Sequence, residues 1–397
     1  MEAEKQGASR LVAFVGGFDP RGARHYHQLM CREAFKQAKV AETVYEVGGR
    51  SPWVYGKEAG LNHSTWKVSA ANGQACDYVF VDWSDQVRAY WPKQTWRVIL
   101  AAIQTYSLVV REFSSLRPLR QETPYTLWTL AYPLIYMVLC VLLASAAFFG
   151  TWLAVPNPWT GVLFGSCNAG LVLFGGYKLD KVLHVSWLLR ILNFARLSSE
   201  QSMAALDEKF LKTADALCAQ IKKGHYQEVV VVGFSVGSAM ALPLVQALQQ
   251  KLQEQKCSLQ KVNFLTLGNC IPLFTLMPRA EVLREQLFAL AQNRNLYWVD
   301  ISSPGDSVSF GMCDLMVLSF ADSNQRNLKN LINPRRMYSP RFHKLFTPTT
   351  YRWLRRNKMR MHFQYLMASE LPGAYDYIAL LTYRGEMTEF ISRNMEK

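Results

Sequence analysis

The sequence predicts an α/β protein in which a mostly parallel sheet, covered by helices on both faces, carries an inserted transmembrane helical hairpin. Two observations predict this fold class. Short apolar runs rich in β-branched residues alternate with longer helical patterns, which is typical of parallel strands buried on both faces. One segment, Thr123 to Tyr177, contains no Asp, Glu, Lys, Arg or His, which is typical of a chain that enters a bilayer.

The composition excludes several classes of protein. Half of the 397 residues are hydrophobic and only 19% are charged, so the chain is too apolar for disorder and long enough for a large core. The eight cysteines are scattered without a C-x-x-C pair, a pattern that favours reduced thiols over a disulfide framework or a zinc site. The 44 Lys and Arg exceed the 30 Asp and Glu and give a net charge of +14.

The strands and helices follow from hydrophobic periodicity. The five predicted strands are Leu11–Val15, Asp77–Trp83, Glu228–Val232, Val262–Leu267 and Leu296–Ile301. The predicted helices cover His25–Gln37, Ser199–Lys223, Val236–Gln255, Arg279–Gln292 and Ala374–Thr382. We therefore expect one α/β domain made of residues 1–122 and 178–397, interrupted between its second and third strands by a hairpin at residues 123–177.

The hairpin divides into two apolar stretches, Tyr125–Gly150 and Gly161–Tyr177, on either side of a turn around Pro156 and Pro158. A bilayer core about 30 Å thick needs about 20 helical residues. The second stretch is short and rich in glycine, so it either spans the bilayer or dips into it. The alternative is a buried helical hairpin in the core of a soluble protein.

The charges that flank the hairpin predict its orientation. Lys and Arg precede and follow the hairpin, whereas its connecting turn has neither. By the positive-inside rule both termini and the α/β domain lie on the cytoplasmic side. The apolar stretch Val98–Val110 is too short to span, and is either an interfacial helix or a core helix of the α/β domain.

The most specific motif is Gly233-Phe-Ser235-Val-Gly237, which follows four consecutive valines and precedes a helical pattern. This is a G-x-S-x-G nucleophile elbow in its strand–turn–helix context. The two glycines leave room for a tight turn that exposes the Ser235 hydroxyl at the carboxyl edge of the sheet. The backbone N–H of Val236, at the start of the helix, points to where an oxyanion would form. The alternative is a glycine-rich turn with a buried serine.

With this motif the chain resembles the α/β-hydrolase superfamily, whose members carry a serine nucleophile on such an elbow. The resemblance implies a Ser, acid, His order along the chain, and a mechanism that needs neither a metal nor an organic cofactor. It implies that the acid follows a later strand. Asp306, in the loop after Leu296–Ile301, is the candidate acid, with Asp300 and Asp314 as alternatives.

Only two histidines, His343 and His362, follow the candidate acid. The late position of His362, before the Pro372-Gly373 turn, fits the family base better than His343, which lies in a basic stretch. No clear strand precedes His362, which departs from the family pattern. The resemblance also implies a second oxyanion donor after an early strand, and the Phe18 N–H beside Gly17 is the candidate; a simple turn is the alternative.

A basic segment lies just before His362. Residues 323–369 contain eleven Lys and Arg and no acidic residue, interleaved with aromatic residues. This combination favours the anionic headgroups of the cytoplasmic leaflet. A solvated basic face is the alternative, and no nucleic-acid motif accompanies the charge, so we do not expect a nucleic-acid partner.

Together these features predict a membrane-anchored serine hydrolase that acts on an acyl ester, a lipid or lipid-linked substrate, through Ser235, His362 and Asp306. An acyltransferase would use the same acyl-enzyme. A non-catalytic membrane adaptor on a hydrolase-like scaffold is the alternative from another class. A channel or transporter is disfavoured, because two spans without charges offer no polar pathway.

Overall fold

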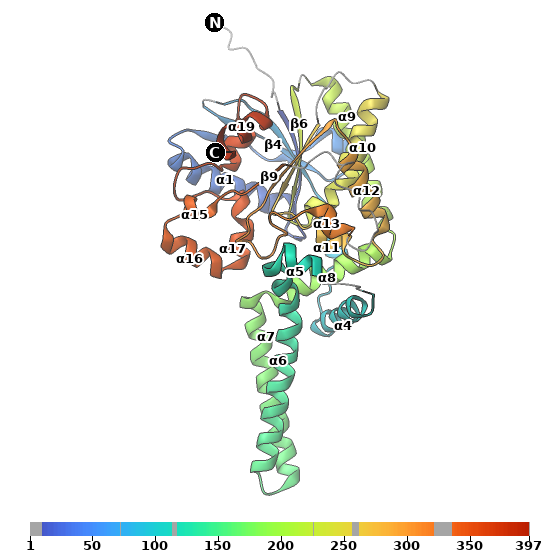
Figure 1. Cartoon of the computed structure of the whole chain (residues 1–397), viewed down its shortest axis with the longest axis vertical. Coiled ribbons are helices and arrows are strands. Elements are labelled where there is room, and N and C mark those ends of the chain that lie inside the picture. The colour runs from blue at the N-terminus through green and yellow to red at the C-terminus, as the bar shows by residue number, and fades with distance from the viewer. Residues whose placement is uncertain are drawn as a thin grey trace. The chain divides into compact units, whose positions relative to one another are not determined.

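The computed structural model describes residues 10–71, 73–112, 117–224, 226–255, 262–320 and 336–396. The chain divides into two compact units, Met1–Ala89 with Ser198–Lys397, and Tyr90–Leu197. The first unit holds the sheet and the second is helical (Figure 1). The segment expected as a hairpin, 123–177, is thus the central part of a longer helical unit.

The predicted α/β class with a mostly parallel sheet is confirmed. Among the described residues the strand order is β2-β4-β5-β1-β6-β7-β8-β9, with β3 paired to β4. The strands from β5 to β9 run parallel, while β2, β3 and β4 form an antiparallel edge. The strands are β1 (Arg10–Val15), β2 (Tyr45–Val47), β3 (Ser51–Pro52), β4 (Ser64–Ala70), β5 (Cys76–Val81), β6 (Glu228–Phe234), β7 (Val262–Leu267), β8 (Leu296–Ile301) and β9 (Arg336–Tyr338).

All five predicted strands are present, as β1, β5, β6, β7 and β8, and every residue of β1, β6 and β7 is buried. The second one is shorter than expected: β5 ends at Val81 because the Asp82 side chain accepts the Ser84 N–H at 2.9 Å and starts a helix. The strands β2, β3, β4 and β9, at or next to the edges of the sheet, were not predicted. They are short or partly exposed, so they lack the continuous apolar run of a central strand.

Helices cover both faces of the sheet (Figure 1). One face carries α1 (Gly22–Val40), α18 (Tyr377–Thr382) and α19 (Met387–Met395), and the other carries α9 (Ala204–Lys223), α10 (Gly237–Glu254) and α12 (Glu281–Gln292). The remaining described elements of this unit are α2 (Val54–Glu58), α3 (Ser84–Ala89), α11 (Ile271–Thr275), α13 (Leu315–Ser319), α15 (Phe342–Leu345), α16 (Pro348–Arg356), α17 (Lys358–Phe363) and the 3₁₀ turn η1 (Gln364–Leu366).

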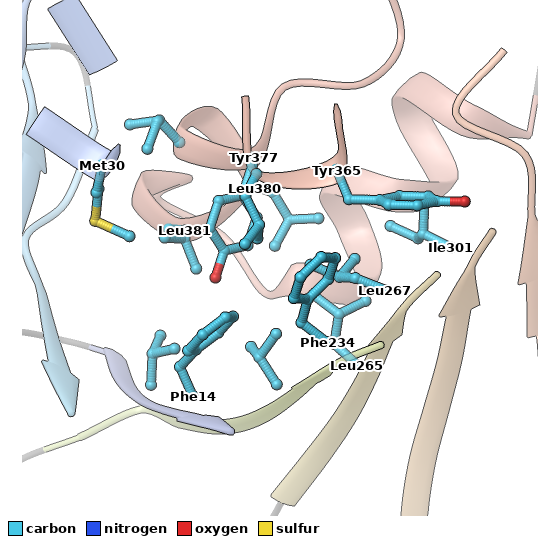
Figure 2. Close-up of a cluster of buried hydrophobic side chains, with 14 of the residues drawn as sticks. Phe14, Met30, Phe234, Leu265, Leu267, Ile301, Tyr365, Tyr377, Leu380 and Leu381 are labelled. Carbon is cyan, nitrogen blue, oxygen red and sulfur yellow. The ribbon is translucent and has the colours of Figure 1, made fainter. Parts of the chain in front are cut away.

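The core on the α1 side joins the sheet to the C-terminal helices. Figure 2 shows Phe14 and Phe234 of the strands directed toward Tyr377 and Leu381 of α18, with Tyr365 beside them. All of these side chains are buried. This packing matters for function because Phe234 immediately precedes Ser235 and Tyr365 lies three residues after His362.

The helical unit consists of α4 (Thr95–Glu112), α5 (Arg117–Glu122), α6 (Pro124–Ala154), α7 (Pro158–Leu183) and α8 (Val185–Glu200), of which the last three residues belong to the first unit. By length and composition α6 and α7 are able to cross a membrane, and only 6% of the apolar window of each is buried. Neither is therefore a core helix of this chain. Both are longer than the predicted stretches, and α7 extends past Tyr177 through a charged end.

The helices α6 and α7 pack side by side as a hairpin (Figure 1). A Cβ at Gly165 would lie 2.9 Å from the Phe148 carbonyl oxygen, so the glycine permits close approach of the two backbones. The Tyr136 hydroxyl donates to the Gly176 carbonyl oxygen at 2.6 Å. Of the glycines that made the second stretch ambiguous in sequence, Gly161, Gly165 and Gly176 therefore lie against α6, whereas a Cβ at Gly170 or Gly175 would meet nothing within 4 Å.

Helix α4 includes the ambiguous stretch Val98–Val110. Val98 and Ala102 pack against α8 in a small cluster, whereas Ile99 and Ile103 are exposed by 44% and 56%. One face of α4 thus packs against α8, and its other apolar face is not covered by any described residue.

Candidate active site

The parallel strands end in register, which brings several loops to one edge of the sheet. Phe234 of β6 pairs with Leu267 of β7, and Leu267 pairs with Ile301 of β8. Val15, the last residue of β1, pairs with Gly233. The loops that follow these strands begin at Gly16, Ser235, Gly268 and Ser302.

Ser235 lies on the turn between β6 and α10 with a left-handed backbone, φ 57°. This conformation costs a non-glycine residue about 1–2 kcal/mol, so the surrounding structure must hold it. The Ser235 N–H donates to the Leu267 carbonyl oxygen at 3.0 Å, and the Ser238 N–H donates to the Ser235 carbonyl oxygen at 3.0 Å. The strained turn is therefore tied to β7 on one side and to α10 on the other.

The glycines of the elbow allow its neighbours to approach. A Cβ at Gly237 would overlap the carbonyl oxygens of Val15 and Gly16, and a Cβ at Gly233 would lie 2.6 Å from Ser238 Cα. Real Cβ atoms do not make such contacts. Gly233 and Gly237 are thus required for close strand–helix packing, as the sequence pattern predicts.

Ser235, His362 and Asp306 form a continuous hydrogen-bonded chain. His362 Nε2 lies 2.7 Å from Ser235 Oγ, and His362 Nδ1 lies 2.8 Å from Asp306 Oδ2. With Nδ1–H donating to the carboxylate, the Nε2 lone pair faces the serine hydroxyl. The three residues are 4%, 1% and 2% exposed. This arrangement suits proton transfer from the hydroxyl to the imidazole.

The loop after β8 holds Asp306 rigidly. Its Oδ1 accepts the Val308 N–H at 3.1 Å, which leaves Oδ2 for His362. Upstream, the Ser303 N–H donates to the buried Tyr365 hydroxyl at 2.8 Å. Tyr365 lies in η1, directly after the helix α17 that carries His362. This tyrosine therefore connects the loop that carries Asp306 to the segment that carries His362.

His362 lies near the end of the short helix α17. The Asn357 side chain caps this helix by accepting the Arg360 N–H at 3.0 Å. The imidazole packs 5.3 Å from the Phe234 ring and edge-on to Phe363. The described strand that precedes it, β9, ends at Tyr338, so helices α15 to α17, not a strand end, carry His362 to the edge of the sheet.

The alternative acids and base have other positions. Asp300 is fully buried on β8, where its two oxygens accept bonds from Thr266, Asn269 and Ser302. Asp314 caps α13 by accepting the Met316 and Val317 N–H groups. His343 is exposed and lies edge-on to Tyr351. None of them has a hydrogen bond to Ser235 or His362 among the described residues.

Both candidate oxyanion donors belong to backbone near Ser235. A Cβ at Gly17 would lie 3.4 Å from Ser235 Oγ, so the Gly17–Phe18 loop passes beside the hydroxyl. The Asp19 N–H donates to the Gly17 carbonyl oxygen at 2.8 Å, and the Asp19 carboxylate holds the Arg21 guanidinium. Val236 is the N-cap residue of α10. The N–H groups at the start of a helix have no carbonyl partner within the helix.

Cys270 and Ser238 also lie at the site, although no motif in the sequence marks them. Cys270 Sγ lies 3.8 Å from Ser235 Oγ, and the Ser238 hydroxyl accepts the Cys270 N–H at 3.0 Å. Burial raises the pKa of the Cys270 thiol, which keeps it protonated rather than nucleophilic. The position of Cys270 after β7, at the same edge as Ser235, is the signal that would have found it.

The basic segment is described from Arg336 onward; Arg326, Lys329 and Arg335 lie outside the described residues. Helix α16 buries Leu354 and exposes basic residues together with one aromatic residue. The exposed side chains are Arg352, Trp353, Arg355 and Arg356. No ion pair to a described carboxylate neutralises these arginines.

Among the described residues no group of three or more His, Cys, Asp or Glu side chains is placed to hold a metal ion. Comparisons of the chain with protein-family models, with curated proteins and with solved structures found no match. The geometry of Ser235, His362 and Asp306 is therefore the basis for assigning a function.

Proposed function

We propose that this chain is a membrane-anchored serine hydrolase that cleaves an acyl ester, with the fold and chain order of the α/β-hydrolase superfamily. The observation that carries the proposal is the hydrogen-bonded chain from Ser235 through His362 to Asp306. The left-handed backbone of Ser235 on a strand–turn–helix elbow supports it.

The geometry supports a proposed role for each group. Ser235 Oγ attacks the acyl carbonyl while His362 Nε2 takes its proton, and the imidazolium then protonates the leaving alcohol. Asp306 orients the imidazole and stabilises its charge. Water, activated by His362, then attacks the acyl-enzyme and releases Ser235.

The oxyanion of the tetrahedral intermediate would be bound by the backbone N–H groups of Val236 and Phe18. Such donors stabilise the charge that develops on the carbonyl oxygen. The ion pair between Asp19 and Arg21 stabilises the loop that carries Phe18, and the Arg21 guanidinium also lies 5.6 Å from the centre of the Phe363 ring, next to His362. This contact would keep the donor loop aligned with the base.

The substrate class follows from the membrane features. We propose that α6 and α7 span the bilayer, with both termini and the sheet unit on the cytoplasmic side. The exposed apolar face of α4 and the basic, Trp353-bearing face of α16 would bind the interface and its anionic headgroups. The enzyme would then meet a lipid or lipid-linked ester at the cytoplasmic leaflet.

Transfer of the acyl group to an alcohol would use the same acyl-enzyme, with the acceptor in place of water. The two outcomes differ only in what resolves the intermediate. Turnover measured with and without added alcohol acceptors separates them.

The first test is labelling of the detergent-solubilised full-length protein with a fluorophosphonate, followed by mass spectrometry of the modified residue. We expect labelling of the wild type at Ser235, none in Ser235→Ala, and a fall in ester turnover by about 10⁴- to 10⁶-fold in that variant. Ser392→Ala, at an exposed serine of α19, is the matched control and should label normally. Folded wild-type protein that does not react would favour the non-catalytic adaptor instead.

A further inference from the structure

The sheet unit contains a cavity of about 350 Å³ that the proposed mechanism does not use. Its walls come from the N-terminal halves of α9, α10 and α12, from α11, from the two residues before α12, and from residues 198–203. This volume lies at the lower end of the range for small-molecule sites, roughly 300–1,000 Å³.

The cavity lies at the same edge of the sheet as Ser235. In a parallel sheet the covering helices run opposite to the strands, so their N-termini lie at the carboxyl ends of the strands. The helices α9, α10 and α12 contribute residues near their N-termini, including Leu206, Ala239 and Leu283. This is the edge where ligands of open α/β sheets bind.

Ser235 does not itself line the cavity, but two elements of the cavity wall are joined to it. Ala239 lies one helical turn after Ser235, and Phe274 lies one turn after Cys270. The Ser238 hydroxyl donates to the Ser235 carbonyl oxygen at 2.5 Å and accepts the Cys270 N–H at 3.0 Å. These bonds join the starts of α10 and α11, which both contribute residues to the wall.

The lining has the chemistry of a site for an amphipathic molecule. Its floor is apolar and buried, formed by Leu206, Phe210, Ala239, Met240 and Phe274. Its rim is polar and carries charges of both signs, on Glu200, Asp207 and Arg279, beside several serines and glutamines. The apolar floor, and not the rim, fits an alkyl chain.

We infer that this cavity holds the acyl chain of the ester that Ser235 attacks, an inference that rests on the proposed function. A methylene group occupies about the volume of a water molecule in the liquid, roughly 30 Å³. The cavity therefore accommodates a chain of roughly ten carbons. Each methylene buried there should raise kcat/KM about fourfold until the cavity is full.

The test compares p-nitrophenyl acetate, butyrate, octanoate and decanoate as substrates of the full-length protein in detergent. Leu283→Trp fills the cavity from a half-buried position on α12, and Glu285→Trp, an exposed residue of the same helix outside the lining, is the matched control. We expect Leu283→Trp to lower kcat/KM for octanoate and decanoate by tenfold or more and to change acetate less than twofold. The control should retain the wild-type preference for long chains.

A second filling variant, Met203→Trp, keeps the test decisive if Leu283→Trp does not fold. Equal kcat/KM for short and long esters in the wild type, or equal losses for all esters in the filling variants, would overturn the acyl-chain assignment while fluorophosphonate labelling of Ser235 still succeeds. A wild type that neither labels nor turns over any ester would overturn the proposed function, and the assignment with it.

Discussion

At the scale of residues, the arrangement around Ser235 combines backbone strain with complete burial. The left-handed Ser235 is held by bonds to β7 and α10, and the buried His362 imidazole packs against the rings of Phe234 and Tyr365. A polar group that is buried in this way needs its partners, since an unpaired one costs about 1–3 kcal/mol. The site is thus both strained and fully hydrogen-bonded, which is typical of preorganised groups.

Asp306→Asn tests the role of the carboxylate. An amide that donates to His362 Nδ1 would stabilise the wrong tautomer, so we expect kcat to fall by about 10⁴-fold with little loss of stability. The matched control is Asp314→Asn, because asparagine caps a helix as well as aspartate does. Turnover of a soluble ester and thermal unfolding would be measured for both. Near-normal turnover in Asp306→Asn would remove Asp306 from the mechanism.

At the scale of elements, the turn from β6 to α10 depends on the lack of side chains at Gly233 and Gly237. The helix starts so close to β1 that a methyl group at Gly237 meets two carbonyl oxygens. The neighbouring residues belong to the loop that carries Phe18, so a shift there would also move the candidate oxyanion donor.

Gly237→Ala should therefore lower both stability and reactivity. We expect a loss of about 1–3 kcal/mol in the free energy of unfolding, as for overpacked sites, together with slower fluorophosphonate labelling. Gly49→Ala is the control, because a Cβ at Gly49 has nothing within 4 Å, and a surface change of this kind stays within about 0.5 kcal/mol. Equal thermal midpoints for the two variants would contradict the close packing of the elbow.

At the scale of the whole molecule, the chain combines a sheet unit that bears the candidate site with a helical unit that bears two apolar helices. The chain enters the helical unit after Ala89 and leaves it before Ser198. The residues that immediately follow, 198–203, line the proposed acyl-chain cavity. The segment that links the two units in sequence thus belongs to the proposed substrate site.

The proposed orientation is tested with single introduced cysteines in membrane vesicles of known sidedness, in a parent whose eight native cysteines are replaced by alanine. Asn157→Cys in the turn of the hairpin should react with a membrane-impermeant maleimide from the non-cytoplasmic side. Lys178→Cys, after the second span, should react only from the cytoplasmic side. Reaction of both from one side would contradict a hairpin that spans the bilayer, and favour a dipping segment.

The sequence predicted the central parts of the fold better than its edges. The valines of Val229–Val232 and the runs Val262–Leu267 and Leu296–Ile301 are buried on both faces, except for the half-buried Tyr297, so hydrophobicity alone marks them. The strand β4 alternates in burial and β9 has only three residues, so neither carries a strong local signal. The uncharged segment predicted helices α6 and α7 in the same way as the apolar runs predicted the central strands. In both cases the signal is the composition of residues that are neighbours in the chain.

The sequence by itself determined the α/β class, the strand–turn–helix around Ser235 and the two apolar helices, since each depends on residues that are neighbours in the chain. Only the tertiary structure decided which acid and which histidine lie beside Ser235. Asp300 lies near the end of β8 and Asp306 lies in the loop after it. Both His343 and His362 follow these acids in the chain. The local sequence pattern therefore leaves open which acid and which histidine act with Ser235. Distance in space separates them, because His362 lies 127 positions from Ser235 and is brought to it only by the packing of the segment α15 to η1 on the sheet.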